Sequence, residues 1–279
     1  MSVVISSSFV VSPSVSGGGT INADNPLIGW NNIVADATIS TTTEDPDFPA
    51  DFMANPATHL RWVGLLSSPE ADEYVTVTNP DLVDLDYIAI ARHNFFTAQI
   101  PVSVEYLDVN SSPEAWVELI AEVLLPNDGP ALFRFPKIPY AAIRLRLQPG
   151  TAAPTIAAVY CGALLVLQRR VYVGHTPIPY GRELMIANHR SVAGNFLGRI
   201  VLGKKTKTAA NLQNLTADWY RANMEPFLIA AQERPFFFAW RPSSYPYEVG
   251  YCWLVNDPMP KNQLANGMMQ VDLQMEGVV

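Results

Sequence analysis

Short runs of alternating apolar and polar residues dominate the first half of the chain. Residues 74–78 (YVTVT) alternate strictly and stop at Asn79-Pro80, as expected for a half-buried strand. Residues 87–91 (YIAIA) are continuously apolar, which is typical of a strand buried on both faces. The same criteria predict strands over residues 37–42, 100–107, 116–125, 131–135, 141–147 and 155–167, and one short helix over residues 50–54. Such spacing predicts a mainly β chain that begins with an antiparallel β-sandwich, or jelly roll.

The second half has a different pattern. A strand is predicted over residues 198–207, and a helix over residues 212–233. The apolar stripe of this helix consists of Leu212, Leu215, Trp219, Met224, Phe227 and Ala231. Thr216 is its candidate N-cap, and Pro226 is expected to kink or split it. Three more strands are predicted over residues 236–240, 250–255 and 268–275. The order β-α-β-β-β is typical of a small α+β domain.

Charge divides the chain at nearly the same place. Residues 1–167 carry 6 Lys or Arg and 18 Asp or Glu, a balance of −12, whereas residues 168–279 carry 12 and 8, a balance of +4. This shift predicts a domain boundary near Arg169-Arg170, between a sandwich over residues 29–167 and an α+β domain over residues 168–279. Neither half has the strongly basic surface of a nucleic-acid-binding protein. No apolar run approaches the roughly 18 residues of a membrane span. We therefore expect neither nucleic acid nor membrane as a partner.

The first 28 residues look unable to form a core of their own. Serines 6–8 and glycines 17–19 separate short apolar runs in this segment. We interpret residues 1–28 as an extended N-terminal arm, loose alone and able to add a strand to a partner's sheet. A simply disordered terminus is the alternative.

The composition points to assembly. Charged residues make up only 16% of the 279 residues, and the mean hydropathy is +0.10. Ordinary domains contain about 25% charged residues, so this chain has few polar groups with which to cover its surface. Burial against copies of itself, in a ring or a trimer, would remove that surface from water.

Two groups of residues resemble a known family. Residues 45–50 (DPDFPA) and 55–62 (NPATHLRW) are followed by residues 86–95 (DYIAIARHNF). Together they resemble the galactose-binding-like (discoidin-type) jelly roll as found in tailed-bacteriophage virion proteins, although Phe95 stands where that family usually has Leu. Residues 215–220 (LTADWY) and 234–242 (RPFFFAWRP) look like small domains of phage tail-tip and distal-tail proteins. The resemblance implies a virion protein of the tail tip, baseplate or neck, made in the host cytoplasm.

Catalytic and metal-binding motifs are missing from the sequence. It holds four histidines, no G-x-S-x-G elbow, no phosphate-binding loop and no recognisable catalytic cysteine. Cys161 and Cys252 lie in apolar strands and are expected to be inert buried thiols. The acidic residues Glu44, Asp45, Asp47 and Asp51 could offer oxygens to Ca²⁺, but a solvated cluster at a helix start is the favoured interpretation. We expect no enzyme activity, no metal and no cofactor.

Two sets of side chains are candidates for binding. Arg61, Trp62, His93 and Asn94 could contact a sugar at one end of the sandwich. Against this, Trp62 could plug the sandwich, Asn94 could make a turn, and His93 could bond to backbone groups. The candidate subunit interface consists of Phe236, Phe238, Trp240, Tyr245 and Tyr247. Its competitor is an internal strand covered on both faces.

The sequence supports three hypotheses for function. The first is a structural component of a tailed-phage virion that binds copies of itself and other virion proteins. The second is a carbohydrate-binding, host-adhesion module for a host surface glycan. The third is a hydrolase with an accessory jelly roll, which would need a carboxylate pair or a triad in a cleft.

Overall fold

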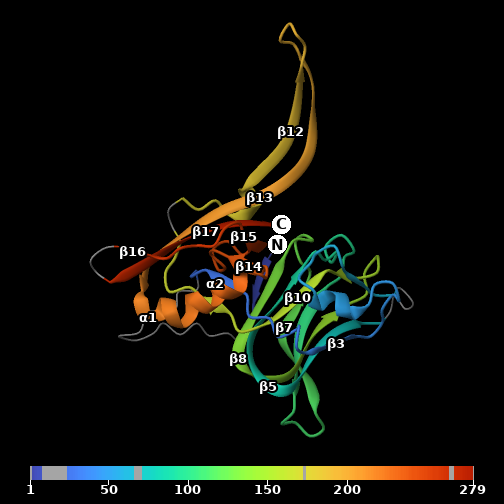
Figure 1. Ribbon diagram of the computed structural model, residues 1–279. Coiled ribbons are helices and arrows are strands. Elements are labelled where there is room, and N and C mark those ends of the chain that lie inside the picture. Colours follow the sequence, from blue (N-terminus) through green and yellow to red (C-terminus); the bar gives the residue numbers. More distant parts are fainter. Residues whose placement is uncertain (1, 8–23, 66–70, 172–173, 264–266, 279) are drawn as a thin grey trace.

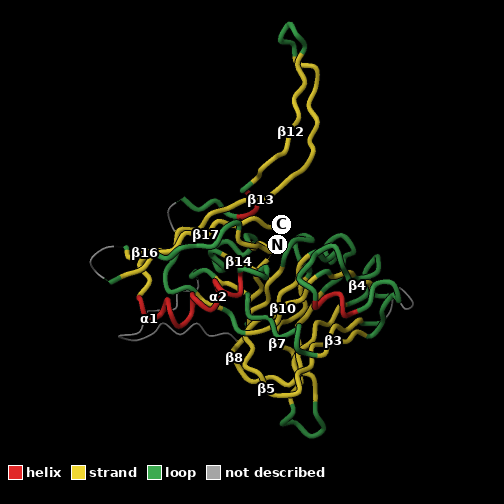
Figure 2. The backbone as a smooth tube through the Cα atoms, viewed as in Figure 1, coloured by secondary structure: helices red, strands yellow, loops and turns green. Residues whose placement is uncertain are grey.

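The computed structural model describes residues 2–7, 24–65, 71–171, 174–263 and 267–278. It is mainly β, with two large sheets and one helical segment, and this confirms the predicted fold class (Figures 1 and 2). Over these residues, no helix has the length and apolar character needed to cross a membrane.

The first sheet wraps around the core of the sandwich. Its strands are β1 (Ser2–Ile5), β3 (Thr38–Thr41), β5 (Glu73–Ala91), β6 (Val102–Asp108), β7 (Ala115–Val123), β8 (Ala131–Leu147) and β10 (Ala158–Gly162). The order is β10-β5-β8-β6-β7, with β1 paired to β8 and β3 paired to β5. Each long strand joins two segments predicted separately: residues 74–78 and 87–91 in β5, and residues 131–135 and 141–147 in β8. Register shifts lie where the prediction placed the breaks, and they let both strands bend.

A small sheet and a short helix close one end of the sandwich. The small sheet pairs β4 (Trp62–Val63) with β9 (Thr155–Ile156), and the 3₁₀ helix η1 (Ala50–Ala54) lies where a short helix is predicted. Trp62 is fully buried in the first core, and its indole N–H donates to the Thr43 carbonyl at 3.2 Å. The end of the sandwich that carries the candidate sugar residues is therefore held by an aromatic plug.

The second sheet carries most of the C-terminal half. Its strands are β2 (Leu27–Gly29), β11 (Leu165–Val166), β12 (Arg182–Arg190), β13 (Phe196–Thr216), β14 (Phe236–Ala239), β15 (Val249–Leu254), β16 (Lys261–Asn262) and β17 (Met268–Val278). The order is β11-β2-β14-β15-β17-β13-β12, and β16 pairs with β17. A 3₁₀ turn, η2 (Ile178–Tyr180), precedes β12. This sheet has more strands than the predicted β-α-β-β-β order. The strands β2 and β11 extend it at one edge, and β12 extends it at the other.

The helical segment begins later than predicted. It consists of α1 (Ala217–Trp219), the π-helical turn η3 (Tyr220–Met224) and α2 (Glu225–Ala231). The predicted first turn, from Leu212, instead finishes β13, where it pairs with β17. Thr216 is the N-cap residue by position but makes no side-chain capping bond. Pro226 lies in the first turn of α2, so the helix is divided just before the proline.

A third apolar cluster lies between the two sheets. It combines sandwich residues such as Tyr87, Ala89 and Tyr160 with Phe237 and Tyr251 of the second sheet. The strands β2 and β11 also belong to the second sheet, although both lie before the predicted boundary at residue 168. The two halves therefore share a core, and the first half contributes β2 and β11 to the second sheet, so the halves do not meet at a simple linker.

The structure corrects the predicted N-terminal arm at both ends. Residues Ser2–Ile5 pair in parallel with Ala131–Arg134 of the same chain, so this strand completes its own sheet rather than a partner's. Residues Leu27–Gly29 are fully buried between β11 and β14. Pairing within the chain satisfies backbone groups that an arm would leave for a partner. Residues 8–23, with glycines 17–19, lie outside the described residues.

One element projects from the molecule. The β12 strand and the first part of β13 form a hairpin at the edge of the second sheet that extends beyond the rest of the molecule (Figure 1). We call residues 182–207 the projecting hairpin. Its β12 strand was not predicted from the sequence.

Candidate ligand-binding pocket

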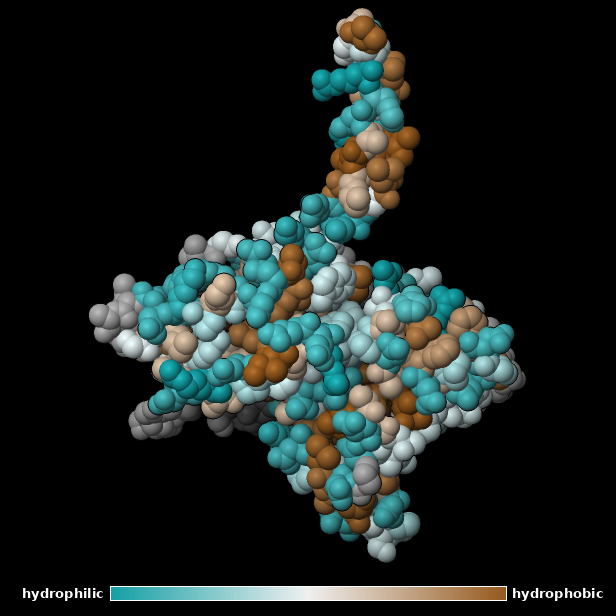
Figure 3. All heavy atoms as spheres, viewed as in Figure 1, coloured by the Kyte–Doolittle hydropathy of each residue, from teal (hydrophilic) through white to brown (hydrophobic). Residues whose placement is uncertain are grey.

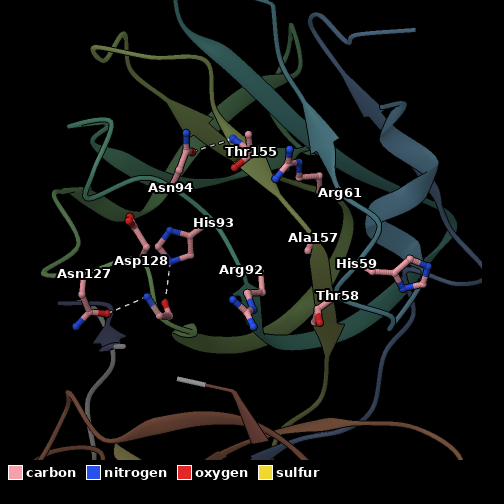
Figure 4. Close-up of a pocket in the computed structure, with 11 residues that line it drawn as sticks. Thr58, His59, Arg61, Arg92, His93, Asn94, Asn127, Asp128, Thr155 and Ala157 are labelled. Atoms are coloured by element: carbon pink, nitrogen blue, oxygen red, sulfur yellow. Dashed lines mark hydrogen bonds between the residues drawn. The ribbon is translucent and has the colours of Figure 1, made fainter. Parts of the chain in front are cut away.

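A polar pocket of about 610 Å³ lies at one end of the sandwich (Figure 4). Its wall comes from the segment after η1, the corner after β5, the β7–β8 turn and the β9–β10 region. The lining residues are Thr58, His59, Arg61, Arg92, His93, Asn94, Asn127, Asp128, Gly129, Thr155 and Ala157. Three of the four predicted sugar residues, Arg61, His93 and Asn94, are thus brought together.

His93 is a fixed part of the wall. The ring is 4% exposed, its Nε2 donates to the Gly129 carbonyl at 2.8 Å, and its Nδ1 accepts from the Phe95 N–H at 3.2 Å. This pattern requires the neutral tautomer protonated on Nε2. Burial lowers the pKa of His93 to about 4 and outweighs the Gly129 bond and the nearby Asp128 charge, which act in the opposite direction. His93 is therefore neutral at physiological pH and has no ring nitrogen left for a ligand.

Asn94 also has a structural role. Its Nδ2 donates to the Ala153 carbonyl at 2.7 Å, and its Oδ1 accepts from the Thr155 N–H at 2.9 Å (Figure 4). The side chain therefore joins the corner after β5 to the start of β9. Asn94 and His93 together fix the geometry of the pocket, and both do so through backbone groups, which for His93 is the alternative interpretation given above.

The pocket has two exposed guanidinium groups, on Arg61 and Arg92. Arg92 has a φ of 54°, a left-handed conformation that is uncommon for a residue other than glycine. Arg61 lies over the Phe48 ring, 5.6 Å from its centroid. Among the described residues, neither arginine takes part in an ion pair.

The carboxylate in the pocket is already engaged. Asp128 accepts hydrogen bonds from the backbone N–H groups of Phe96 and Thr97, at 2.9 and 3.0 Å, and from the Thr97 hydroxyl. These bonds hold the β7–β8 turn against the loop after β5. The pocket thus has more positive than negative charge, in a half of the chain whose balance is −12.

Trp62 does not contribute to this pocket, because its ring is in the first core. Arg92 is the residue that sequence reasoning missed. It stands next to His93 in the same predicted corner. Its left-handed backbone conformation could not be predicted, because neither the residue type nor the hydrophobic periodicity indicates a positive φ at an arginine.

The predicted aromatic interface is divided by the structure. Phe236 and Phe238 are buried in the second core and pack under the helical segment, while Phe237 faces the core between the sheets. The strand is thus covered on both faces, which corrects the interface prediction for Phe236 and Phe238. Trp240 stacks on Tyr245 with centroids 5.5 Å apart, and Tyr245 and Tyr247 are exposed. Only this outer part of the group is available to a partner.

The other candidate groups have local roles. Glu44 accepts from the Ala50 N–H at 2.8 Å, at the start of η1, and Asp45 accepts from the Asp47 N–H at 2.9 Å. In the part of the chain that the structure describes, no three His, Cys, Asp or Glu side chains are grouped as a metal site. Cys161 and Cys252 are buried free thiols, and burial raises the pKa of each.

No protein-family model and no curated protein sequence matches this chain. Several solved structures of carbohydrate-binding modules match slightly less than half of it. The module CpGH89CBM32-5 from Clostridium perfringens, in complex with GalNAc-β-1,3-galactose, has 10% identity and a TM-score of 0.40, covering 47% of this chain and 99% of that chain. The family 32 module of C. perfringens NanJ, in complex with galactose, has 16% identity and a TM-score of 0.40, covering 48% and 98%.

Chitosan-binding module 1 from a chitosanase/glucanase of Paenibacillus sp. IK-5 has 10% identity and a TM-score of 0.40, covering 47% and 97%. These similarities fit the β-sandwich described above. At such scores they carry no argument about a ligand, and the phage part of the family resemblance remains a hypothesis.

Proposed function

We propose that this protein is a non-catalytic binding protein whose sandwich takes an acidic saccharide in the pocket beside Arg61 and Arg92. The observation that carries the proposal is the pair of exposed guanidinium groups in a polar pocket whose own carboxylate is engaged. Guanidinium groups bind carboxylate and sulfate through parallel hydrogen bonds, and hydroxyl-rich ligands suit a pocket lined by Thr, Asn and backbone groups.

Rigidity supports this proposal. The buried contacts of His93 and Asn94 fix the corner that carries Arg92. A backbone held in a sparsely populated conformation is a recurring feature of ligand sites, because the surrounding structure must maintain it. A pre-organised wall loses little conformational entropy when it binds a ligand.

A glycan array followed by calorimetry tests the proposal. We expect binding to saccharides that carry carboxylate or sulfate, with an affinity at least about tenfold weaker in Arg92→Ala and Arg61→Ala. Lys137→Ala is the matched control, since this exposed cation lies outside the pocket. Binding of no acidic glycan, or equal binding by all four proteins, would refute the proposal.

A second candidate function is a structural role in the tail tip, baseplate or neck of a tailed-phage virion. The observation that favours it is the projecting hairpin, a form suited to joining copies of a chain. Mass spectrometry of purified particles encoded by the same genome tests it. A fixed number of copies per particle is expected, and absence of the chain from the particles would refute the virion role.

A further inference from the structure

Exposed apolar residues are concentrated on the projecting hairpin. Of 22 large hydrophobic side chains exposed in the described residues, eight lie between positions 184 and 202. They are Leu184, Met185, Val192, Phe196, Leu197, Ile200, Val201 and Leu202. In Figure 3 their apolar surface runs along much of the hairpin, beyond the body of the molecule. Contiguous exposed apolar surface of this kind marks an interaction site.

The apolar residues occupy both faces of the hairpin. Ile186 pairs with Val201, and the next pair is Ala187 with Ile200. Successive pairs in a two-stranded ribbon point to opposite faces. Leu202 and Leu197 lie at the two register shifts, where the extra residue adds to the exposed surface. A partner must therefore enclose the hairpin rather than cover one side of it.

The hairpin differs in charge from the remainder of the chain. Residues 182–207 hold six Lys or Arg against the single acid Glu183, a balance of +5. Since the whole chain has −8, the other residues have a balance of −13, and residues 1–167 alone have −12. A basic apolar projection and an acidic body are complementary, and both are present in every copy of this chain.

A protein partner suits the hairpin better than a lipid bilayer does. Asn188, Arg190 and Arg199 interrupt the apolar surface between the tip and the lower stem, and Arg199 Nε donates to Asn188 Oδ1 at 2.9 Å. If the hairpin entered a bilayer, burying these guanidinium groups among the lipid chains would cost free energy. Carboxylates on a protein surface would instead pair with them.

We propose that the projecting hairpin binds a second copy of this chain, where the acidic sandwich of that copy encloses it. The hairpin is then the contact by which copies join head to tail, and a heterologous contact of this kind gives a ring or an open filament. This inference rests on the second candidate function and is independent of the saccharide pocket.

Light scattering of the full chain over a wide range of concentrations tests the inference. We expect a mass above that of the monomer, and a dissociation constant at least about tenfold larger in Ile200→Glu and in Val201→Glu, one on each face. Met259→Glu is the matched control, because Met259 is exposed on the body. Equal melting temperatures would show that the hairpin variants fold.

The charge contribution has its own test. Lys204→Glu and raised salt should both weaken the association. Three outcomes would overturn the inference. The first is a monomer at every concentration, and the second is assembly that is unchanged in both apolar variants. The third is hairpin-dependent binding to vesicles of anionic lipid in place of self-association. If neither salt nor Lys204→Glu changes the association, the claim that the hairpin binds an acidic surface of the second copy is wrong. Hairpin-dependent association of a protein missing from virions would instead refute the virion role alone.

Discussion

The rings of Tyr160 and Tyr251 meet edge to face between the two sheets, with centroids 5.8 Å apart and planes at 89°. Tyr160 belongs to the sandwich and donates to the carbonyl of Pro235, while Tyr251 belongs to the second sheet and donates to the carbonyl of Pro56, at 2.7 Å. Each tyrosine therefore bonds to the opposite half of the chain. Burial raises the pKa of both hydroxyls, so both remain neutral donors at physiological pH.

We expect Tyr251→Phe to lower the free energy of unfolding by about 1–2 kcal/mol, because the Pro56 carbonyl loses its partner at a partly buried site. Unfolding should remain a single transition, since the core between the sheets ties both halves together. Denaturant titration measures this. Tyr247→Phe is the control, because Tyr247 is 60% exposed. Equal loss in both variants, or none in Tyr251→Phe, would contradict the assignment.

The continuous apolar runs were the most informative part of the sequence. Residues 87–91 were predicted to be buried on both faces, and all five have 0% exposure. Ile88 and Ile90 face the first core, whereas Tyr87 and Ala89 face the core between the sheets. The partner on the second face was not predictable, because part of it comes from β14 and β15, more than a hundred residues later in the sequence, and part from the short strand β2, which has no clear pattern of its own.

The projecting hairpin shows the opposite case. Residues 182–190 (RELMIANHR) have neither a strict alternation nor a helical period, because apolar residues face solvent on both sides. Periodicity reports which face is buried, so a strand with no buried face within its own chain has no such signal. Trp62 shows another limit, because an aromatic residue beside a candidate site can equally be part of the core.

His93 should make stability depend on pH. Its pKa is about 4 in the folded chain and 6.5 when unperturbed, so between these values the unfolded chain binds a proton that the folded chain does not. Stability is then complete above about pH 6.5 and falls by up to about 3 kcal/mol as the pH drops to 4. Denaturation of wild type and His93→Gln across this range measures the effect.

The difference between the two His93 curves isolates this residue, because other titrating groups such as His175 remain in both proteins. A flatter curve for His93→Gln is expected. Parallel curves would show that protonation of His93 is not linked to folding.

Gly162 is required by a close approach of two backbone segments. A Cβ at this position would lie 2.1 Å from the carbonyl oxygen of Asn31. We expect Gly162→Ala to destabilise the chain by about 1–3 kcal/mol, because the backbone must shift. Gly203→Ala is the matched control, since its Cβ would meet only the Met185 sulfur, at 3.6 Å. Thermal melts should separate the two variants, and an unchanged melt for Gly162→Ala would show that the segment can move freely.

The first strand should contribute to stability rather than only to assembly. Deletion of residues 1–7 removes β1, with its ladder to β8 and the Val3 side chain in the core between the sheets. We expect a lower melting temperature together with faster hydrogen exchange of those amides in Ala131–Arg134 that face β1 rather than β5. A protein that melts like the wild type but fails to associate would instead support the arm interpretation.

Arg144 is held in a way that lysine cannot reproduce. Its guanidinium carbon lies 4.0 Å from the ring centroids of both Tyr74 and Trp116, and its Nε and one terminal nitrogen lie 2.7 and 2.6 Å from Glu105 Oε2. Glu105 is only 8% exposed. A lysine keeps the charge but loses the planar stack and one of the two donors, so Arg144→Lys should cost about 1–2 kcal/mol.

The reciprocal change gives the control for Arg144→Lys. Lys137 forms an exposed pair with Asp84 at 4.0 Å, so Lys137→Arg should leave the free energy of unfolding nearly unchanged. Denaturant titration of both variants separates charge from geometry. If Arg144→Lys unfolds like the wild type, then positive charge alone is enough to stabilise Glu105. Arg146, whose terminal nitrogen lies 3.7 Å from Glu105 Oε1, is the second cation that could contribute to that charge.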